Sequence, residues 1–487
     1  MPAFTTSHGI IDVANWGYQL QGIDGAPLVP EFYATSPHEL VVIDYSSDGR
    51  DDGMHTPAQI DAIKNKPGGG VAVSYISIGE ASDFRDDWDP AWTTNGQGDG
   101  TLTALAPHWL GPTDPNWPES RKVRYWESGW QDKIFNASHT GALDKVVTQG
   151  FDGAYLDIVD AYYFWAAEAT AAERLPGDPL AGDEHDAAAR MIDFIVAMTA
   201  HARDTNPDFF VILQNGDFII DALDGADPAR KAALLDAIGG IAVEDVYLRG
   251  GDAPENNAFR PDAERIAVLQ RDFLGNGKPV FAVDYVTDAA LMGKFVERAI
   301  DDGFIPTVAP NRQLDRTFAA LQSPATVTES ADLVAGTAAA EVIQGLGGND
   351  WIFGFGGSDQ LDGGTGQDHL IGGTGRDVLH GGSERDLFIF HSAAETHSGS
   401  SRDVIDDFER HLDRIDVRAI DAKASTSAND AFKWIGRGGF HHKAGELRFH
   451  DTGRHGFVEG DVNGDGRADF KILVLNIAGL DKADLIL

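Results

Sequence analysis

Acidic and amide side chains end, or lie just past, short apolar runs in the first 320 residues. In chain order they are Asp44, Glu80, Asp157, Gln214, Asn215, Glu244 and Asp284. Two carboxylates on either side of a sugar can hydrolyse a glycosidic bond, because one attacks the anomeric carbon or activates water while the other protonates the leaving oxygen. A divalent metal site is the competing interpretation, but these runs carry no histidine beside the acids, and His55 and His139 fall in expected loops. The pattern therefore favours a catalytic or sugar-binding ring.

The elements that would position this ring alternate between strand and helix patterns. The apolar runs cover residues 17–21, 40–44, 71–78, 153–157, 209–214, 241–244, 280–284 and 304–308. Helix-like patterns lie between several of them, at 187–203, 229–237, 262–274 and 289–302. Eight alternations predict an α/β fold of the (β/α)8 TIM-barrel type, whose active sites lie at the C-terminal ends of the strands. An open doubly wound sheet is the alternative, although no phosphate-type glycine loop follows the first run.

Aromatic residues lie on or just after several of these runs. They are Trp16, Tyr18, Tyr45, Tyr75, Trp126, Trp130, Tyr155, Tyr162, Tyr163 and Tyr247. Flat aromatic faces can stack on the C–H surface of a sugar ring, but they also fill barrel cores. Both interpretations stay open.

Four segments carry a resemblance to a known family. They read Asn-Trp-Gly-Tyr-Gln-Leu-Gln-Gly at 15–22, Val-Val-Ile-Asp-Tyr at 41–45, Ser-Tyr-Ile-Ser-Ile-Gly-Glu-Ala at 74–81 and Gly-Phe-Asp-Gly-Ala-Tyr-Leu-Asp at 150–157. Over about residues 14–310 the chain resembles glycoside hydrolase family 114, the endo-α-1,4-polygalactosaminidases and their relatives. The resemblance implies a barrel with a catalytic aspartate after strand four and a glutamate after strand six. These map onto Asp157 and Glu244, the latter through a shorter match beside Asp245.

The resemblance implies an endo-acting α-glycosidase that needs no catalytic cofactor. Asp157 would be the nucleophile of a retaining mechanism, and Glu244 the acid and then the base, which requires the carboxyl groups to lie about 5–5.5 Å apart. The expected substrate-binding residues are Trp16, Gln19, Asp44, Tyr75, Glu80, Asp160, Gln214, Asn215, Tyr247 and Asp284. The segment 91–124, rich in Gly, Pro and Trp, is expected to reshape the cleft.

The charge of the chain limits its partners. Lys and Arg number 38 and Asp and Glu 77, a net charge of −39. This balance argues against nucleic acid or an anionic membrane as partner and favours cations or a cationic polymer such as a partly deacetylated galactosamine polysaccharide. The same charge would also serve solubility or growth at high salt. No apolar stretch is long enough to predict insertion into a membrane.

A nine-residue period begins at Gly336. Its acidic position holds Glu341, Asp350, Asp359, Asp368, Asp377 and Asp386, and two residues later an apolar residue recurs: Ile343, Ile352, Leu361, Leu370, Leu379 and Phe388. Glycine turns with aspartate oxygens suit Ca²⁺, and a thin core with rows of acids should fold only when calcium binds. This segment resembles the RTX calcium-binding repeats, which form a parallel β-roll.

The segment after the repeats resembles the C-terminal domain of serralysin-type exported proteins. The matching stretches are residues 386–390, 403–408, 413–416 and 461–470. Alternating Asp461, Asn463 and Asp465 could bind a further Ca²⁺ or form an ordinary hairpin turn. The expected calcium ligands, through side chains or turn carbonyls, are Gly345, Gly347, Asp350, Gly354, Gly356, Asp359, Gly363, Thr365, Asp368, Gly372, Thr374, Asp377, Asp386, Asp461, Asn463 and Asp465.

The chain ends in Asp484-Leu-Ile-Leu487, which resembles the uncleaved signal of type I secretion, while residues 1–16 lack the pattern of a secretory signal peptide. We therefore expect an extracellular protein exported by the type I machinery. Its predicted parts are a catalytic barrel at 1–322, a linker at 323–335, a β-roll at 336–395 and a C-terminal β domain at 396–487.

Two other functions are weighed. A non-catalytic adhesin that binds exopolysaccharide is the main alternative. A serralysin-like protease is disfavoured because the His-Glu-x-x-His zinc signature is absent. The chain has no cysteine, which excludes disulfides and thiolate catalysis.

Overall fold

The chain divides into two compact units. The computed structural model describes residues 2–487 except positions 7, 23–26, 35, 37, 67–68, 224, 250–255, 315–320, 323–326, 330, 338, 397–401 and 424–429. The first unit comprises Met1–Tyr285 and Ala299–Phe318, and the second Val286–Arg298 and Ala319–Leu487. Within the part of the chain that is described, no helix combines the length and the apolar character needed to cross a bilayer.

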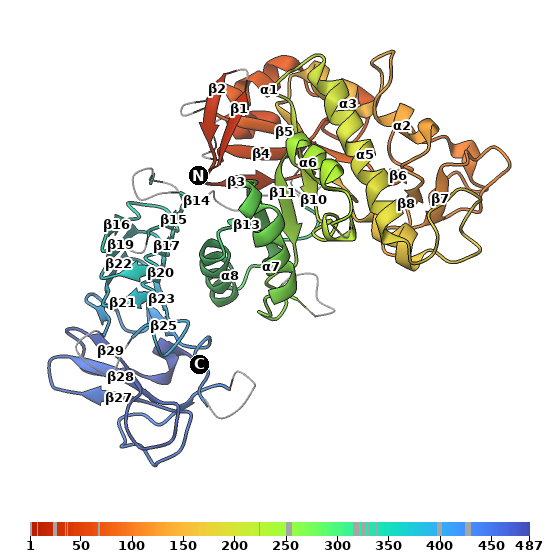
Figure 1. Ribbon diagram of the computed structural model, residues 1–487. Helices are drawn as coiled ribbons and strands as arrows, with labels where there is room; N and C mark the ends of the chain where they lie inside the picture. The colour runs from red at the N-terminus through yellow and green to blue at the C-terminus, as the bar shows by residue number, and fades with distance from the viewer. Residues whose placement is uncertain are drawn as a thin grey trace. The chain divides into compact units, whose positions relative to one another are not determined.

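The first unit contains eight parallel strands that neighbour one another in chain order (Figure 1). They are β3 (Trp16–Tyr18), β4 (Leu40–Asp44), β5 (Val71–Ser77), β9 (Gly153–Asp157), β10 (Phe210–Gln214), β11 (Ile238–Glu244), β12 (Val280–Tyr285) and β13 (Ile305–Ala309). Each coincides with one of the predicted apolar runs. A doubly wound sheet reverses its strand order at a switch point, whereas this sheet does not. The predicted (β/α)8 barrel is therefore confirmed.

The first and last strands close the barrel through side chains. Trp16 Nε1 donates to the carbonyl of Ile305 at 3.0 Å, and Thr307 Oγ1 donates to the carbonyl of Trp16 at 2.7 Å. Inside, apolar side chains from the strands pack into one core with Trp16, Tyr155 and Phe281 among its largest members. This core holds the strand ends in fixed positions.

Helices lie outside the strands (Figure 1). They are α1 (Pro57–Lys64), α2 (Ser128–Ile134), α3 (Ala142–Gln149), α4 (Ala161–Tyr163), α5 (Glu184–Arg203), α6 (Pro228–Ala237) and α7 (Ala263–Asp272), while α8 (Ala289–Asp301) belongs mostly to the second unit. Helix α1 begins at a capping box between Thr56 and Gln59, and α3 ends at Gly150, whose φ of 86° is in the left-handed region that glycine tolerates. The four predicted helices match α5, α6, α7 and α8.

Two small antiparallel sheets were not predicted. A hairpin of β1 (Ala3–Thr6) and β2 (Gly9–Asp12) precedes the barrel. Strands β6 (Glu80–Ser82), β7 (Leu110–Thr113) and β8 (Ser120–Val123) form a three-stranded sheet. Beside this sheet the rings of Trp88, Trp92, Trp109 and Trp130 contact one another in sequence at centroid distances of 5.1–5.4 Å. Residues 91–124 thus form a small folded lobe.

The second unit contains two sheets, each with a parallel run. One consists of β14 (Leu321–Gln322), β15 (Leu333–Ala335), β17 (Trp351–Phe353), β20 (His369–Ile371), β23 (Leu387–Ile389), β25 (Arg414–Asp416) and β30 (Leu485–Ile486). The other consists of β16 (Val342–Gln344), β19 (Gln360–Thr365), β22 (Val378–Ser383), β24 (Val404–Ile405), β29 (Phe470–Val474), β28 (Gly456–Asp461), β27 (Glu446–Asp451) and β26 (Lys433–Trp434). A pair of two-residue strands, β18 (Gly356–Gly357) and β21 (Thr374–Gly375), lies apart from both.

The nine-residue period becomes a roll with two repeat units per turn. Trp351 pairs with His369, and Val342 with Gln360, so neighbouring strands are 18 residues apart. The six periodic apolar residues are each at most 1 % exposed and form a continuous core. This arrangement confirms the predicted all-β parallel roll.

The roll and the segment that follows it share their sheets. Strands β27, β28 and β29 extend one sheet in antiparallel fashion, β25 and β30 extend the other, and one core runs from Val334 to Leu485. Strand β15, within the predicted linker at 323–335, pairs with β17, so the sheet begins before Gly336. Positions 323–326 and 330 of that linker lie outside the described residues.

Candidate active site

Asp157 ends strand β9 and accepts two hydrogen bonds. The hydroxyl of Tyr75, on β5, donates to Asp157 Oδ2 at 2.5 Å, and the Ile158 N–H donates to Oδ1 at 2.8 Å. Ile158 has φ of 58°, which is strained for a β-branched residue and is often a mark of a functional site. Burial raises the pKa of Asp157 to about 6, against the opposing effect of the Tyr75 hydrogen bond and with a further rise from the charge of Glu244.

Glu244 ends strand β11 in a similar setting. The Tyr285 hydroxyl donates to Glu244 Oε2 at 2.6 Å, and Asn215 Nδ2 donates to Oε1 at 3.1 Å. Arg265 donates to the backbone carbonyl of Glu244 at 3.0 Å. Asn215 and Asp245, directly after β10 and β11, also have positive φ values of 56° and 53°. Both carboxylates therefore project from sharp turns at strand ends.

The two carboxylates lie at the same end of the barrel. Strand β10 separates β9 from β11, and all three run parallel. The charge of Glu244 acts on Asp157, and both charges, after burial, raise the pKa of the Tyr155 hydroxyl, which lies on β9 two residues before Asp157. The two carboxylates therefore interact electrostatically at this end of the barrel.

An acidic pocket of about 870 Å³ adjoins Glu244. Its wall carries seven carboxylates against one arginine: Asp160, Asp183, Glu184, Asp217, Asp221, Glu244, Asp245 and Arg265. The arginine is already paired with Asp217. Tyr162 and Tyr163 line the same pocket, and Tyr163 is 46 % exposed. The pocket thus offers negative charge and an accessible aromatic face.

A second pocket, of about 310 Å³, contains Tyr75. Cations and aromatic rings alternate with acids along its wall, among them Tyr45, Glu80, Phe84, Arg85, Lys133 and Lys145. Tyr75, in the wall of this pocket, donates to Asp157, while Glu244 lies in the wall of the acidic pocket.

Four predicted substrate-binding residues line these pockets. Asp160 and Asn215 lie in the wall of the acidic pocket, and Tyr75 and Glu80 in the wall of the second. Glu80 forms an ion pair with Lys122 from β8, although burial raises its pKa to about 8. The lobe at 91–124 thereby contributes a cation next to the second pocket.

Other predicted residues are engaged in holding the framework. Asp44 forms an ion pair with Arg85 at 2.6 Å, Gln19 accepts from Tyr33 at 2.5 Å, and Gln214 accepts from Tyr155. Asp284 is buried and accepts from the backbone N–H of Tyr247 at 3.2 Å. Burial, with the charge of Asp245, raises the pKa of Asp284 well above its ordinary range.

The prediction that Trp16 and Tyr247 contact the substrate does not fit the structure. Trp16 is 1 % exposed and Tyr247 is fully buried. Trp16 bonds across the barrel seam, and the Tyr247 hydroxyl donates to Asp302 at 3.1 Å. We therefore assign both side chains to the barrel core, because a ring without exposed surface cannot stack on a sugar.

Three residues that surround Glu244 were not predicted to be part of the site. Tyr285 and Arg265 contact Glu244, and Asp217 pairs with Arg265. Tyr285 directly follows Asp284 at a strand end, which is a signal that sequence reasoning could have used. Arg265 lies on a helix and Asp217 in a loop, where no local pattern marks them.

The aspartates of the roll form a hydrogen-bonded ladder. Oδ1 of Asp350, Asp368 and Asp386 accepts the N–H of the acidic residue 18 positions earlier at 2.8, 2.9 and 3.0 Å. Oδ2 of Asp350, Asp359, Asp368, Asp377 and Asp386 is buried without a hydrogen-bond partner among the described residues. Burial raises the pKa of Asp350, Asp377 and Asp386 to about 7 and of Asp359 and Asp368 to about 6.

The unsatisfied oxygens fit a hard cation. A methyl group placed on Gly363 would lie 2.4 Å from Asp368 Oδ2 and 2.5 Å from the Gly381 carbonyl oxygen, so two oxygens converge on this turn. The same holds around Gly345 and Gly354. Buried carboxylate and carbonyl oxygens are the ligands that Ca²⁺ prefers. The geometry of these turns is therefore consistent with the predicted calcium-binding repeats.

The second predicted calcium motif is already satisfied by its own backbone. The Asp461 carboxylate accepts the N–H groups of Gly464 and Gly466 at 2.6 and 2.9 Å, and Asn463 Oδ1 accepts that of Asp465 at 2.8 Å. The segment joins the antiparallel strands β28 and β29. This geometry favours the hairpin turn, while calcium binding there stays a prediction.

Comparison with known proteins identifies the two parts. The model of glycoside-hydrolase family GH114 matches residues 5–325, and that of the peptidase M10 serralysin C terminal matches residues 345–487. An uncharacterised protein from Thermotoga maritima is 33 % identical over 287 residues, 59 % of this chain and 75 % of the relative. One from Methanocaldococcus jannaschii is 34 % identical over 309 residues, 62 % of this chain and 77 % of the relative.

A solved structure also resembles the chain. The glycoside hydrolase domain of PelA from Pseudomonas aeruginosa superimposes with a TM-score of 0.43 and 16 % identity, covering 63 % of this chain and 99 % of that domain.

Proposed function

The chain belongs to glycoside hydrolase family GH114, and we propose that it is an exported, endo-acting hydrolase of α-linked, galactosamine-containing polysaccharide. The observation that carries this proposal is the electrostatically coupled pair Asp157 and Glu244 at one end of the barrel. Each is held by a tyrosine hydroxyl and lies at or next to a pocket.

We assign the two carboxylates the roles that the family resemblance implies. Tyr75 and the Ile158 N–H stabilise the ionised form of Asp157, so that its oxygen can attack the anomeric carbon. Glu244 gives its proton to the leaving glycosidic oxygen as that bond breaks. In the second step Glu244 takes a proton from water, whose oxygen displaces Asp157 and releases the sugar.

The acidic pocket supports a cationic substrate. Seven carboxylates in its wall create a negative potential that attracts the free amino groups of a deacetylated hexosamine polymer. The accessible ring of Tyr163 can stack on a sugar face. A chain that enters one pocket and leaves by the other would be cut internally, which supports endo action.

The C-terminal region supports export. Its serralysin-type match and its calcium-binding repeats suggest an extracellular protein. We propose that the type I machinery exports the chain before it folds and that external calcium then completes the roll.

The decisive test is an assay on the full, calcium-loaded chain. It would be incubated with α-1,4-galactosamine polymer, the fully N-acetylated polymer and a neutral α-glucan, and new reducing ends and product sizes would be measured. We expect oligosaccharides of mixed length from the cationic polymer early in the reaction. Binding without new reducing ends would refute hydrolysis and favour the adhesin function.

A further inference from the structure

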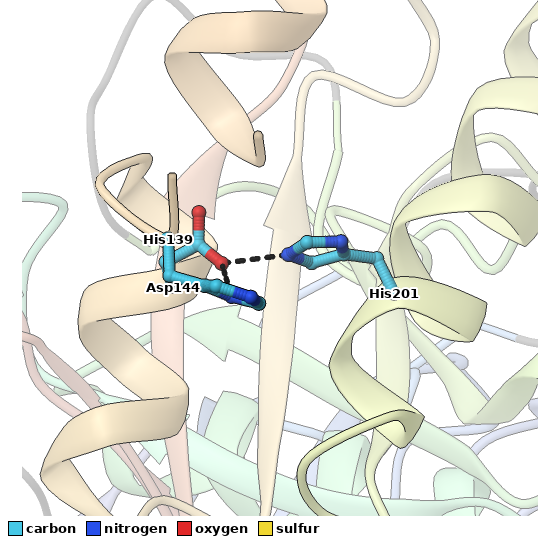
Figure 2. A group of neighbouring side chains, drawn as sticks. All are labelled: His139, Asp144 and His201. Atoms are coloured by element: carbon cyan, nitrogen blue, oxygen red, sulfur yellow. Dashed lines mark hydrogen bonds and ion pairs between the residues drawn. The ribbon is translucent and has the colours of Figure 1, made fainter. Parts of the chain in front are cut away.

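Two imidazoles and one carboxylate converge where helices α3 and α5 meet (Figure 2). His139 lies in the loop before α3, Asp144 in the first turn of α3 and His201 in the last turn of α5. Asp144 Oδ1 lies 3.2 Å from His139 Nδ1 and 2.7 Å from His201 Nε2. All three atoms lie within 4.8 Å of one another.

The surrounding residues orient this cluster. Asp144 is 4 % exposed, and its Oδ2 accepts the N–H groups of Gly141 and Asn136 at 3.0 and 3.2 Å, so Oδ1 is left facing the imidazoles. The Asn136 side chain folds the loop by accepting the Ser138 N–H at 2.9 Å. The His201 ring packs against Phe135 and His139 at centroid distances of 5.1 and 5.0 Å.

The negative charge of the buried Asp144 carboxylate would be stabilised by a bound cation. A buried carboxylate is costly unless a positive charge compensates it. Across the described chain, the ion-pair partners of Asp144 are the two histidines alone. A neutral imidazole supplies a hydrogen bond but no charge.

The donor set also matches a particular class of ion. Two imidazole nitrogens and one carboxylate oxygen are ligands of Zn²⁺ and related transition metals. Tetrahedral ligands about 2.0–2.1 Å from zinc are about 3.3 Å apart. The 3.2 Å between His139 and Asp144 is close to this spacing, and the 2.7 Å between His201 and Asp144 would lengthen when the ion enters. The His139 side chain is 59 % exposed, which leaves room for a water ligand.

We propose that His139 Nδ1, Asp144 Oδ1 and His201 Nε2 bind one divalent transition-metal ion, for which Zn²⁺ is the probe. The ion would tie the loop before α3 to the end of α5. Asn136 and Thr140 of this loop line the second pocket, so the ion would also stiffen that wall. This site is separate from the calcium ladder, whose ligands are all oxygens.

The test is a zinc titration of the full chain, stripped of transition metals and kept in saturating calcium so that the roll ligands are occupied. Calorimetry should find one site of higher affinity than any other. His139→Ala and His201→Ala should each weaken it by more than the roughly 10–100-fold that loss of an outer-shell partner costs. His108→Ala, which changes another exposed histidine of the first unit, should leave it unchanged.

A second measurement identifies the ligands. Co²⁺ bound by nitrogen and oxygen in a four- or five-coordinate site absorbs visible light more strongly than hydrated Co²⁺, and this absorption should vanish in both histidine variants. His139→Ala removes an exposed side chain, so a folding defect cannot explain its effect. If zinc binds wild type and both variants equally, the cluster is only a hydrogen-bonded cap on α3 and the proposal is wrong.

Discussion

The barrel and the roll both place aspartates at the ends of parallel strands, but they compensate the charges differently. In the barrel, buried Asp44 pairs with Arg85, Glu80 with Lys122 and Asp152 with Lys64. In the roll, each periodic aspartate uses one oxygen on a backbone N–H and leaves the other unsatisfied. The barrel therefore carries its own counter-charges, whereas the roll must obtain them from bound cations.

The proposed catalytic pair is not compensated in this way. Over the residues that are described, neither Asp157 nor Glu244 forms an ion pair with lysine or arginine, and both accept from tyrosine hydroxyls instead. A hydroxyl orients a carboxylate without neutralising it. Asp44, Glu80 and Asp152 are thus paired with cations. The two proposed catalytic acids have no such partner among the described residues, so each can gain or lose a proton during the reaction.

The largest expected effect is that of removing calcium, which should destabilise the roll and leave the barrel folded. With EDTA, backbone amides of Asp350, Asp368 and Asp386 should lose protection from hydrogen exchange, because uncompensated carboxylates repel across the turns. Amides of β9, β10 and β11 should keep theirs. Added Ca²⁺, but not equimolar Mg²⁺, should restore protection. Roll amides that stay protected in EDTA would contradict the comparison.

The next largest effect is on catalysis. Asp157→Asn and Glu244→Gln keep side-chain shape but remove the reactive oxygen, so kcat/KM should fall by at least about 10²–10⁴-fold. Glu264→Gln, an exposed change on α7, should have no effect. Thermal unfolding of all three should match wild type. Full activity in either catalytic variant would remove that residue from the mechanism.

A pH series sharpens the account of the roll. Its aspartates have folded pKa values of about 6 to 7, above about 3.9 for the unfolded chain. Between these values the folded state binds more protons, so without calcium its free energy of unfolding falls as pH rises.

The measurement is urea unfolding in EDTA at pH 5 and pH 8, followed at the largely buried Trp351. We expect a lower midpoint at pH 8 and a smaller difference for Asp368→Asn, which cannot ionise. A midpoint that is higher at pH 8 would show that the ladder does not control stability.

The smallest expected effect concerns Tyr75. Tyr75→Phe removes a hydrogen bond that lowers the pKa of Asp157, so that pKa should rise above about 6. Because Asp157 must be ionised to attack, the acid limb of kcat/KM should move up by roughly one pH unit. Tyr125→Phe, whose hydroxyl donates to Ala187, is the matched control. An upward shift of the alkaline limb, with the acid limb unchanged, would instead make Asp157 the proton donor.

Much of the architecture could be predicted because short stretches of sequence with regular apolar patterns form most of its strands. Each barrel strand is an apolar run with clear limits, and the six roll residues recur in strict phase. The sheet of β6, β7 and β8 could not be predicted from the sequence, because β7 reads Leu-Gly-Pro-Thr, a composition typical of turns.

The position of acids at strand ends was predictable, but their partners were not. Lys122 reaches Glu80, and Arg85 reaches Asp44, across about forty residues that carry no shared pattern. Likewise, the sequence predicted that Trp16 stacks on the sugar, but in the structure this side chain is buried where the first and last barrel strands meet. Local sequence fixes which groups lie at the mouth, while long-range packing decides which of them remain available.

The aspartate ladder has a direction. Every rung is an oxygen from a later coil that holds an N–H of an earlier one, and Asp403 and Asp413 supply the final two rungs for Asp377 and Asp386. Each turn of the roll therefore has its backbone hydrogen bonds satisfied only after the next turn along the chain has formed. The roll should therefore form first at its carboxyl-terminal end and extend toward its amino-terminal end. The order in which its parts are exposed to calcium would then decide how readily the roll forms.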